Sequence, residues 1–189
     1  MSKVTNAADY TRRPREHLAR LGLTLATRDE IVQGRDIASR TVGPTVATVE
    51  TLQAVQDRTR CAAFAYHGVD GALAGVLCII PLTRAAAPSL AAGVLDGISP
   101  PLEIAARPHD PVIAVYGWGM AGVTWRGRAV VMAAALAIHR EIYDTVPLYG
   151  RAATPGGERT LLGRLGARPA PGPGGLVVCP AWTAQRKVA

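Results

Sequence analysis

Two arginines separated by one glycine, Arg126 and Arg128, stand where a glycine-rich run gives way to an alanine-rich run. Gly117, Gly119 and Gly122 precede them and permit a bulge or the close approach of a ligand. If a helix starts at this corner, unpaired amide groups and two guanidinium groups meet at one point, which suits an anion such as a phosphate. A plain strand–helix corner with solvated arginines fits the spacing equally well, so both interpretations stay open.

The anion interpretation requires a strand before the corner and a helix after it. Residues 112–124 follow Pro111 and begin with β-branched side chains, which predicts a strand. Residues 125–142 predict a helix, because alanine has high helix propensity and the apolar side chains recur at helical spacing. His139 and its two charged neighbours are expected at the outer end. The apolar stripe consists of Val131, Ala135, Ile138 and Ile142.

Helices and strands alternate along the rest of the chain. The sequence Thr27-Arg-Asp-Glu30 has the form of a capping box and opens a helix through about Arg40. Taken together, the expected helices and strands predict a single α/β domain of the α+β type, with a mixed sheet flanked by helices. The other expected elements are a helix at 14–21, a strand at 23–27, a helix at 46–57, an antiparallel hairpin of 61–66 and 72–80, a helix at 88–95, a strand at 147–153, a short helix with Leu161, Leu162 and Leu165 facing inward, and a strand at 174–179.

Residues 81–111 form a long connection rich in alanine and proline. A compact domain seldom contains so long a connection without a reason, so we expect either a lid over a site or a surface insertion. Three titratable groups near its end, Glu103, His109 and Asp110, are expected to be solvated.

Composition limits the classes of partner. With 189 residues, 49% of them hydrophobic, the chain can bury the core of one domain. Its formal charge of +7 favours polyanionic partners such as CoA-type phosphates. Specific nucleic-acid binding is disfavoured, because aromatic side chains do not interleave with the basic cluster beyond Tyr10. That cluster is Arg12, Arg13, Arg15 and Arg20.

The three cysteines, Cys61, Cys78 and Cys179, lie within apolar runs. They show no Cys-x-x-Cys spacing and leave an odd number for pairing, so we expect buried free thiols and no metal site. The longest apolar run is shorter than the ~20 residues of a membrane-spanning helix. A soluble cytoplasmic protein without a membrane partner is therefore expected.

Three stretches resemble the GNAT superfamily of acetyl-CoA-dependent N-acyltransferases, over about Leu23 to Cys179. The resemblance implies a GNAT-like central mixed sheet, an N-terminal extension at 1–22 and an acyltransferase domain at 23–189, in which 81–111 is the insertion or lid. The stretches are Leu25-Ala-Thr-Arg-Asp-Glu30, Val123-Thr-Trp-Arg-Gly-Arg-Ala-Val130 and Leu161-Leu-Gly-Arg-Leu-Gly-Ala167.

In that family the turn after the fourth strand reads Gln/Arg-x-x-Gly-x-Gly/Ala, and its amides bind the pyrophosphate of acetyl-CoA. Arg126 matches the first position here, while Ala129 and Val131 replace the glycine and the final small residue. Gly127 is expected to let the backbone approach the phosphate, and Val131→Gly is expected to tighten CoA binding. The implied cofactor-binding residues are Gly119, Ala121, Trp125, Arg126, Gly127, Arg128 and Ala129.

Many family members carry a tyrosine that protonates the leaving thiolate, and Leu162 stands at that position here. Tyr116 and Tyr149, together with Thr154, remain as catalytic candidates by neighbourhood. Strand side chains that are packed or hydrogen-bonded structurally are the alternative interpretation.

The resemblance implies transfer of an acyl group from acetyl-CoA or another acyl-CoA to an amine of a small molecule or protein. A homodimer is an open alternative for the assembly. The alternative function is a non-catalytic GNAT-like binding module that has lost acetyl-CoA chemistry. Binding of CoA separates the two hypotheses, because only the enzyme requires it.

Overall fold

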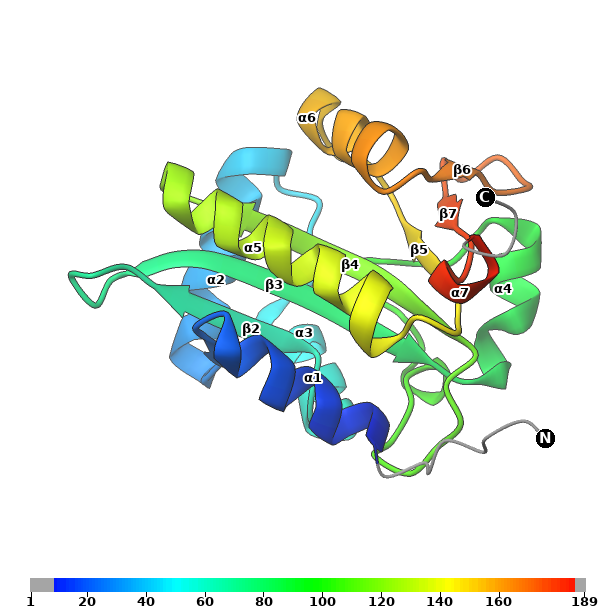
Figure 1. The fold of residues 1–189 in the computed structure, drawn as a ribbon, viewed down its shortest axis with the longest axis horizontal. Helices are drawn as coiled ribbons and strands as arrows, with labels where there is room; N and C mark the ends of the chain where they lie inside the picture. Colours follow the sequence, from blue (N-terminus) through cyan, green and yellow to red (C-terminus); the bar gives the residue numbers. More distant parts are fainter. Residues whose placement is uncertain (1–8, 186–189) are drawn as a thin grey trace.

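The computed structural model describes residues 9–185, which form a seven-stranded mixed sheet with helices on both faces (Figure 1). The strand order is β1-β2-β3-β4-β5-β7-β6. The β4–β5 pair is parallel and every other neighbouring pair is antiparallel. The strands are β1 (Leu23–Leu25), β2 (Ala63–His67), β3 (Leu73–Leu82), β4 (Ala114–Gly122), β5 (Leu148–Gly150), β6 (Arg168–Pro169) and β7 (Val177–Cys179).

Helices α1 and α5 cover one face of the sheet, and α2 and α3 cover the other (Figure 1). A π-helical turn, η3 (Ile138–Ile142), extends α5, and a second one, η4 (Arg159–Arg164), extends α6. Two short 3₁₀ turns are η1 (Arg84–Ala86) and η2 (Leu102–Ile104). The α-helices are α1 (Asp9–Arg20), α2 (Arg28–Val42), α3 (Val49–Thr59), α4 (Ala87–Ala92), α5 (Trp125–Ala137), α6 (Pro155–Glu158) and α7 (Trp182–Gln185).

The start of α2 confirms the predicted capping box. The Thr27 hydroxyl accepts the Glu30 amide at 3.3 Å, and the Glu30 carboxylate accepts the Thr27 amide at 2.6 Å. These bonds satisfy two backbone donors that a helix start leaves unpaired. The helix ends at Gly43, whose φ of 102° is a conformation that favours glycine.

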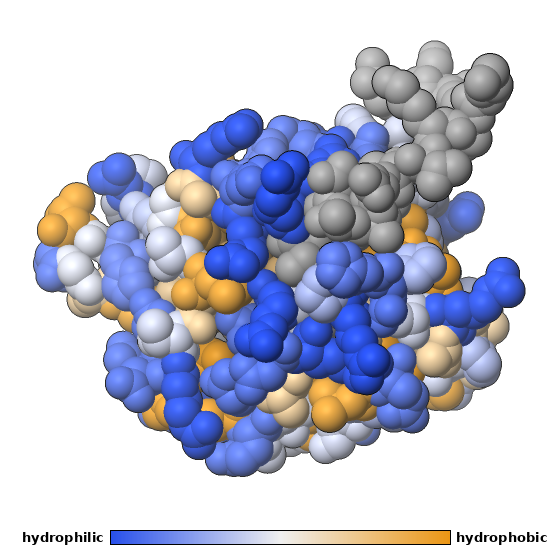
Figure 2. Space-filling model, turned by 90° about the horizontal axis from the view of Figure 1, so that it is seen from below, coloured by the Kyte–Doolittle hydropathy of each residue, from blue (hydrophilic) through white to orange (hydrophobic). Residues whose placement is uncertain are grey.

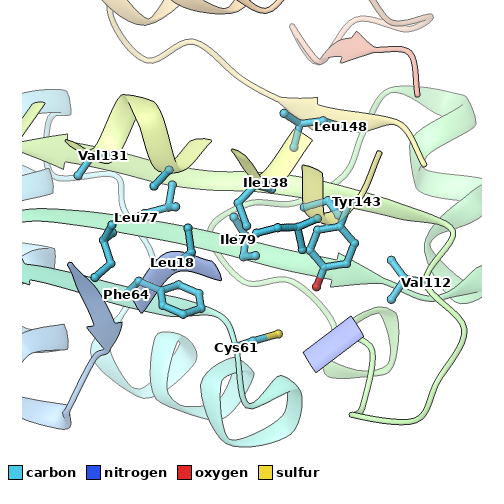
Figure 3. Close-up of a cluster of buried hydrophobic side chains, with 14 of the residues drawn as sticks. Leu18, Cys61, Phe64, Leu77, Ile79, Val112, Val131, Ile138, Tyr143 and Leu148 are labelled. Carbon is cyan, nitrogen blue, oxygen red and sulfur yellow. The ribbon is translucent and has the colours of Figure 1, made fainter. Parts of the chain in front are cut away.

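Two hydrophobic clusters fill the faces of the sheet. The first lies between the sheet and the α1–α5 layer and contains Val131, Ile138 and Ile142 of the predicted stripe (Figure 3). Leu18 of α1 is fully buried in the same cluster, so α1 packs onto the sheet. Residues 1–8 of the expected N-terminal extension lie outside the described residues.

The connection 81–111 contributes much of the second cluster. Leu90, Leu95 and Ile104 are buried there with residues of β3 and β4. Backbone hydrogen bonds tie its two ends together, from Thr83 to the carbonyl of Ile104 and from Ala106 to the carbonyl of Pro81. A large part of this connection is therefore core, and only the segment around 94–98 borders the cavity described below.

The structure differs from the sequence-based predictions at a few residues and elements. Leu162 was expected to face inward, but it is 41% exposed, because η4 turns Leu161 and Leu165 toward the core instead. All three cysteines are free thiols as predicted, but Cys78 is only half-buried. The two-residue strand β6 and helix α7 were not predicted.

The surface gives no sign of a membrane-spanning element. Within residues 9–185, every helix is too short or too polar to cross a bilayer. On the face that Figure 2 shows, hydrophilic side chains dominate and hydrophobic ones form small patches.

His139 was expected at the outer end of a helix, yet it is 1% exposed. The reason is α7, whose Trp182 ring lies over it with 6.1 Å between ring centroids. The guanidinium of Arg140 lies 4.7 Å from the centre of the same Trp182 ring. Neither ring nitrogen of His139 has a hydrogen-bond partner among the described residues. Burial, with a contribution from the Arg140 charge, lowers the pKa of His139.

We expect His139→Leu to raise the free energy of unfolding at neutral pH by about 1 kcal/mol, because an unsatisfied buried polar group costs roughly that much or more. The unfolded chain binds a proton at His139 more readily than the folded chain does. Stability of the native protein should therefore fall as the pH drops below the ordinary histidine value of about 6.5. Urea unfolding between pH 5 and 8 measures this slope, using denaturation midpoints. An equal slope in the leucine variant would contradict the assignment.

Candidate functional site

The parallel pair β4–β5 is short and then opens. Its register joins Val115 to Leu148, Tyr116 to Tyr149 and Gly117 to Gly150. Beyond Gly117 β4 runs on to Gly122, and no strand within residues 9–185 pairs with that part on the β5 side. One edge of β4 from Trp118 onward therefore offers backbone groups to a ligand.

A β-bulge marks the point where the two strands part. On β3, Cys78 pairs with Gly119 and the next residue, Ile79, pairs with Gly117, so Trp118 is the extra residue. Bulges bend a strand and increase its twist, which accounts for the divergence of β4 from β5. The indole Nε1 of Trp118 donates to the carbonyl of Gly97. This bond fixes the 94–98 segment against the bulge.

A cavity of about 770 Å³ passes through this opening. On one face of the sheet it is bordered by α2 and by the segments 45–47 and 94–98. On the other face it reaches Ala135, Ile138 and Leu161, which belong to α5, η3 and η4. Its size is that of a small-ligand site, and most of its lining is apolar.

The polar groups near the opening form one hydrogen-bonded cluster. The Arg151 guanidinium donates to the carbonyl of Gly174 at 2.6 Å and to the carbonyl of Leu95. It also lies near enough to the hydroxyl of Tyr116 to influence the pKa of that group. Burial raises the pKa of Tyr116, and the Arg151 charge opposes that effect. Tyr116 is therefore neutral at physiological pH and keeps a proton that it can donate.

The structure brings both tyrosine candidates to the cavity. Tyr116 and Tyr149 are register partners on the neighbouring strands β4 and β5, and both line the cavity. Thr154 also lines it, but its hydroxyl accepts the amide of Gly157 at 3.1 Å as the cap of α6. A catalytic role for either tyrosine stays a prediction.

Three further residues at this site, Trp118, Arg151 and Asp96, were not predicted from the sequence. Arg151 directly follows the short strand β5, and Trp118 lies between two glycines of β4. Side chains at the carboxyl ends of adjacent parallel strands commonly face a ligand, and that signal could have singled out Arg151. Its carbonyl partners could not have been anticipated, because they belong to distant loops.

The predicted cofactor-binding residues fall into two groups. Gly119 and Ala121 line the cavity, whereas Trp125 through Ala129 form the first turn of α5 outside its lining. The Thr124 hydroxyl caps that turn by accepting the Gly127 amide at 2.9 Å. Arg126 and Arg128 are exposed, and Trp125 is 76% exposed.

Two residues of the glycine motif have structural roles that the sequence did not reveal. A Cβ on Gly127 would overlap the carbonyl oxygen of Ala74, so β3 requires glycine at this position with or without a phosphate. Val131 is 2% exposed, and its Cγ2 lies 2.7 Å from where a Cβ on Gly75 would stand. Its side chain points into the core (Figure 3), so the expectation that it crowds the phosphate surface was wrong.

Three titratable groups of 81–111, namely Glu103, His109 and Asp110, lie away from the cavity lining, whereas Asp96 belongs to it. Glu103 and His109 are exposed, and Asp110 accepts the amide of Arg107 at 2.9 Å. Among residues 9–185 no three His, Cys, Asp or Glu side chains gather closely enough to hold a metal ion.

Comparisons with protein-family models, with curated proteins and with solved structures found no match. The class that the structure defines is an α/β protein with a seven-stranded mixed sheet flanked by helices.

Proposed function

We propose that this protein is an acyltransferase that moves an acyl group from acyl-CoA to an amine. The observation that carries the proposal is the opening between β4 and β5, through which a largely apolar cavity connects the two faces of the sheet. Such a passage lets a thioester approach from one face and a nucleophile from the other.

The free edge of β4 suits the pantetheine arm of CoA. That arm is extended and contains two amide groups, which can pair with strand backbone in the manner of an added strand. A ligand that follows β4 from Trp118 toward Gly122 arrives at the start of α5. The helix dipole and the side chains of Arg126 and Arg128 favour an anion there, as the CoA pyrophosphate is.

Acyl transfer from a thioester to an amine requires the protein mainly to position the two reactants. The amine nitrogen attacks the thioester carbonyl carbon as the free base, the C–N bond forms and the C–S bond breaks. The proton that the nitrogen loses goes to the thiolate. Holding the reactants in line supplies much of the rate, and backbone amides of β4 would stabilise the oxyanion. Tyr116 and Tyr149 are the proton donors nearest the opening, since both line it.

We expect Arg128→Ala to weaken CoA binding about tenfold, because a charge-assisted contact to phosphate is lost. The fold should persist, since the one hydrogen bond that the Arg128 side chain makes within residues 9–185 is a long one of 3.5 Å to the carbonyl of Gly122. Calorimetric titration with CoA and with a pantetheine fragment measures the effect, which should largely vanish for the fragment.

Arg84→Ala is the matched control, because Arg84 is an exposed arginine of η1 outside the cavity lining. Equal affinities of the Arg84 and Arg128 variants for CoA would argue against a pyrophosphate at the α5 corner.

A non-catalytic binding module is the second candidate. It is favoured by the surroundings of two candidate groups. Tyr116 is buried, with 4% of its surface exposed. Glu30 is occupied by the Thr27 amide and by His67 at 2.9 Å. Release of free thiol from acetyl-CoA in the presence of amines distinguishes the candidates, since a binding module releases none.

A further inference from the structure

The cavity has a hydrophobic wall on the face of the sheet that α2 covers. Ile31, Ala38 and Val42 of α2 line it opposite Val76 and Cys78 of β3. The body of an apolar molecule would bury hydrophobic surface against these side chains. Two charged residues of α2, Glu30 and Arg35, line the cavity as well.

The mouth of this part of the cavity is hydrophobic too. Val42, Val94 and Ile98 all line the cavity and are all among the large hydrophobic side chains that remain exposed. They come from the end of α2 and from the 94–98 segment. Exposed apolar side chains that gather at the rim of a cavity are typical of a site for an apolar ligand.

One carboxylate at the cavity, that of Asp96, has an oxygen that accepts no hydrogen bond from residues 9–185. Asp96 Oδ1 accepts the amides of Ile98 and Ser99 at 2.7 and 3.2 Å, whereas Oδ2 accepts no hydrogen bond from the described residues. Glu30, the other carboxylate of the lining, is committed to Thr27 and His67.

Asp96 also lies near the β4–β5 opening. It is close enough to Tyr116 for its charge to raise the pKa of that hydroxyl. Its chain neighbours Leu95 and Gly97 are held to the opening by the side chains of Arg151 and Trp118. A cationic group attracted by Asp96 therefore stands beside the point where the strands part.

We propose that the α2-side part of the cavity binds a small hydrophobic amine, with its body against α2 and its ammonium group beside Asp96. The role of that amine as acyl acceptor rests on the proposed acyltransferase function. Binding of the amine itself does not require CoA, so the two proposals fail in different experiments.

The test is calorimetric titration of the full chain, without CoA, with phenylbutylamine, phenylbutanol and phenylbutyrate. These probes share a hydrophobic body and differ in charge. We expect the amine to bind about tenfold more tightly than the alcohol, and the acid to bind most weakly. Equal binding of all three would overturn the role of Asp96, and tightest binding of the acid would assign the polar end to Arg35, which also lines the cavity.

Two variants locate the site. Asp96→Asn keeps an oxygen for the amides of Ile98 and Ser99, and should reduce amine binding about tenfold while leaving the alcohol unchanged. Gly119→Leu places a side chain in the cavity, because a Cβ on Gly119 meets no atom within 4 Å, and should abolish binding of all three probes.

Gly163→Leu is the control for the second variant. A Cβ on Gly163 also meets no atom within 4 Å, but this glycine is exposed on η4 and does not line the cavity. Unchanged probe binding by Gly119→Leu, or absence of binding to the native chain at millimolar probe, would overturn the proposal. Amine binding by a chain that fails to bind CoA would uphold the site and remove its role in acyl transfer.

Discussion

Replacing Gly127 by alanine is expected to destabilise the fold by about 3 kcal/mol, at the upper end of the usual cost of overpacking. The added methyl would overlap the Ala74 carbonyl oxygen and stand 2.8 Å from the Ala74 carbonyl carbon. Neither partner can yield easily. β3 is held between β2 and β4, and the start of α5 is held by the Thr124 cap.

Urea unfolding of the native chain and of Gly127→Ala measures this difference. Gly163→Ala is the matched control, because a methyl there meets no neighbouring atom and should cost nothing. If Gly127→Ala were as stable as that control, the close packing of α5 on β3 would be incorrect.

Val131→Gly is expected to cost about 3 kcal/mol as well. Val131 is buried in the first hydrophobic cluster, so its loss removes a core side chain worth roughly 1.5–3 kcal/mol. Glycine inside a helix adds ~1 kcal/mol. Thermal or urea unfolding gives the total.

Ala129→Gly separates the two contributions, because Ala129 is exposed in the same helix and its loss reports the cost of glycine alone. The GNAT resemblance alone suggests that Val131→Gly tightens CoA binding. The structure removes the reason for that expectation, because the side chain faces Gly75 in the core. Equal stability of Val131→Gly and Ala129→Gly would contradict the burial of the Val131 side chain.

Local signals in the sequence predicted local structure well. The Thr27–Glu30 capping box, the buried stripe of α5 and the β2–β3 hairpin all depend on residues a few positions apart, and all are present. The free thiols were predicted from the apolar runs around the cysteines, their spacing and their odd number. In these cases each backbone or side-chain preference points to the same outcome.

Features that depend on distant partners were not predictable in this way. His139 is buried because α7, more than forty residues further along the chain, covers it. Arg151 binds a carbonyl 56 residues earlier and another 23 residues later. Leu90 and Leu95 belong to a core that the alanine- and proline-rich composition of 81–111 conceals.

The candidate site was predicted only in part, because most of its features depend on residues that are distant in the sequence. Composition and spacing pointed to the β4–α5 corner, and Tyr116 and Tyr149 do line the cavity. The opening of β4 from β5, the Trp118 bulge and the free oxygen of Asp96 arise from strand pairing and loop packing. Those depend on tertiary structure rather than on neighbouring residues.

The measurement that tests the acyltransferase proposal most directly is calorimetric titration of the native chain with acetyl-CoA, CoA and a longer acyl-CoA. The proposal predicts saturable binding at one site, weaker for a pantetheine fragment that lacks the pyrophosphate. No measurable binding of any of the three CoA species by the folded chain would contradict it.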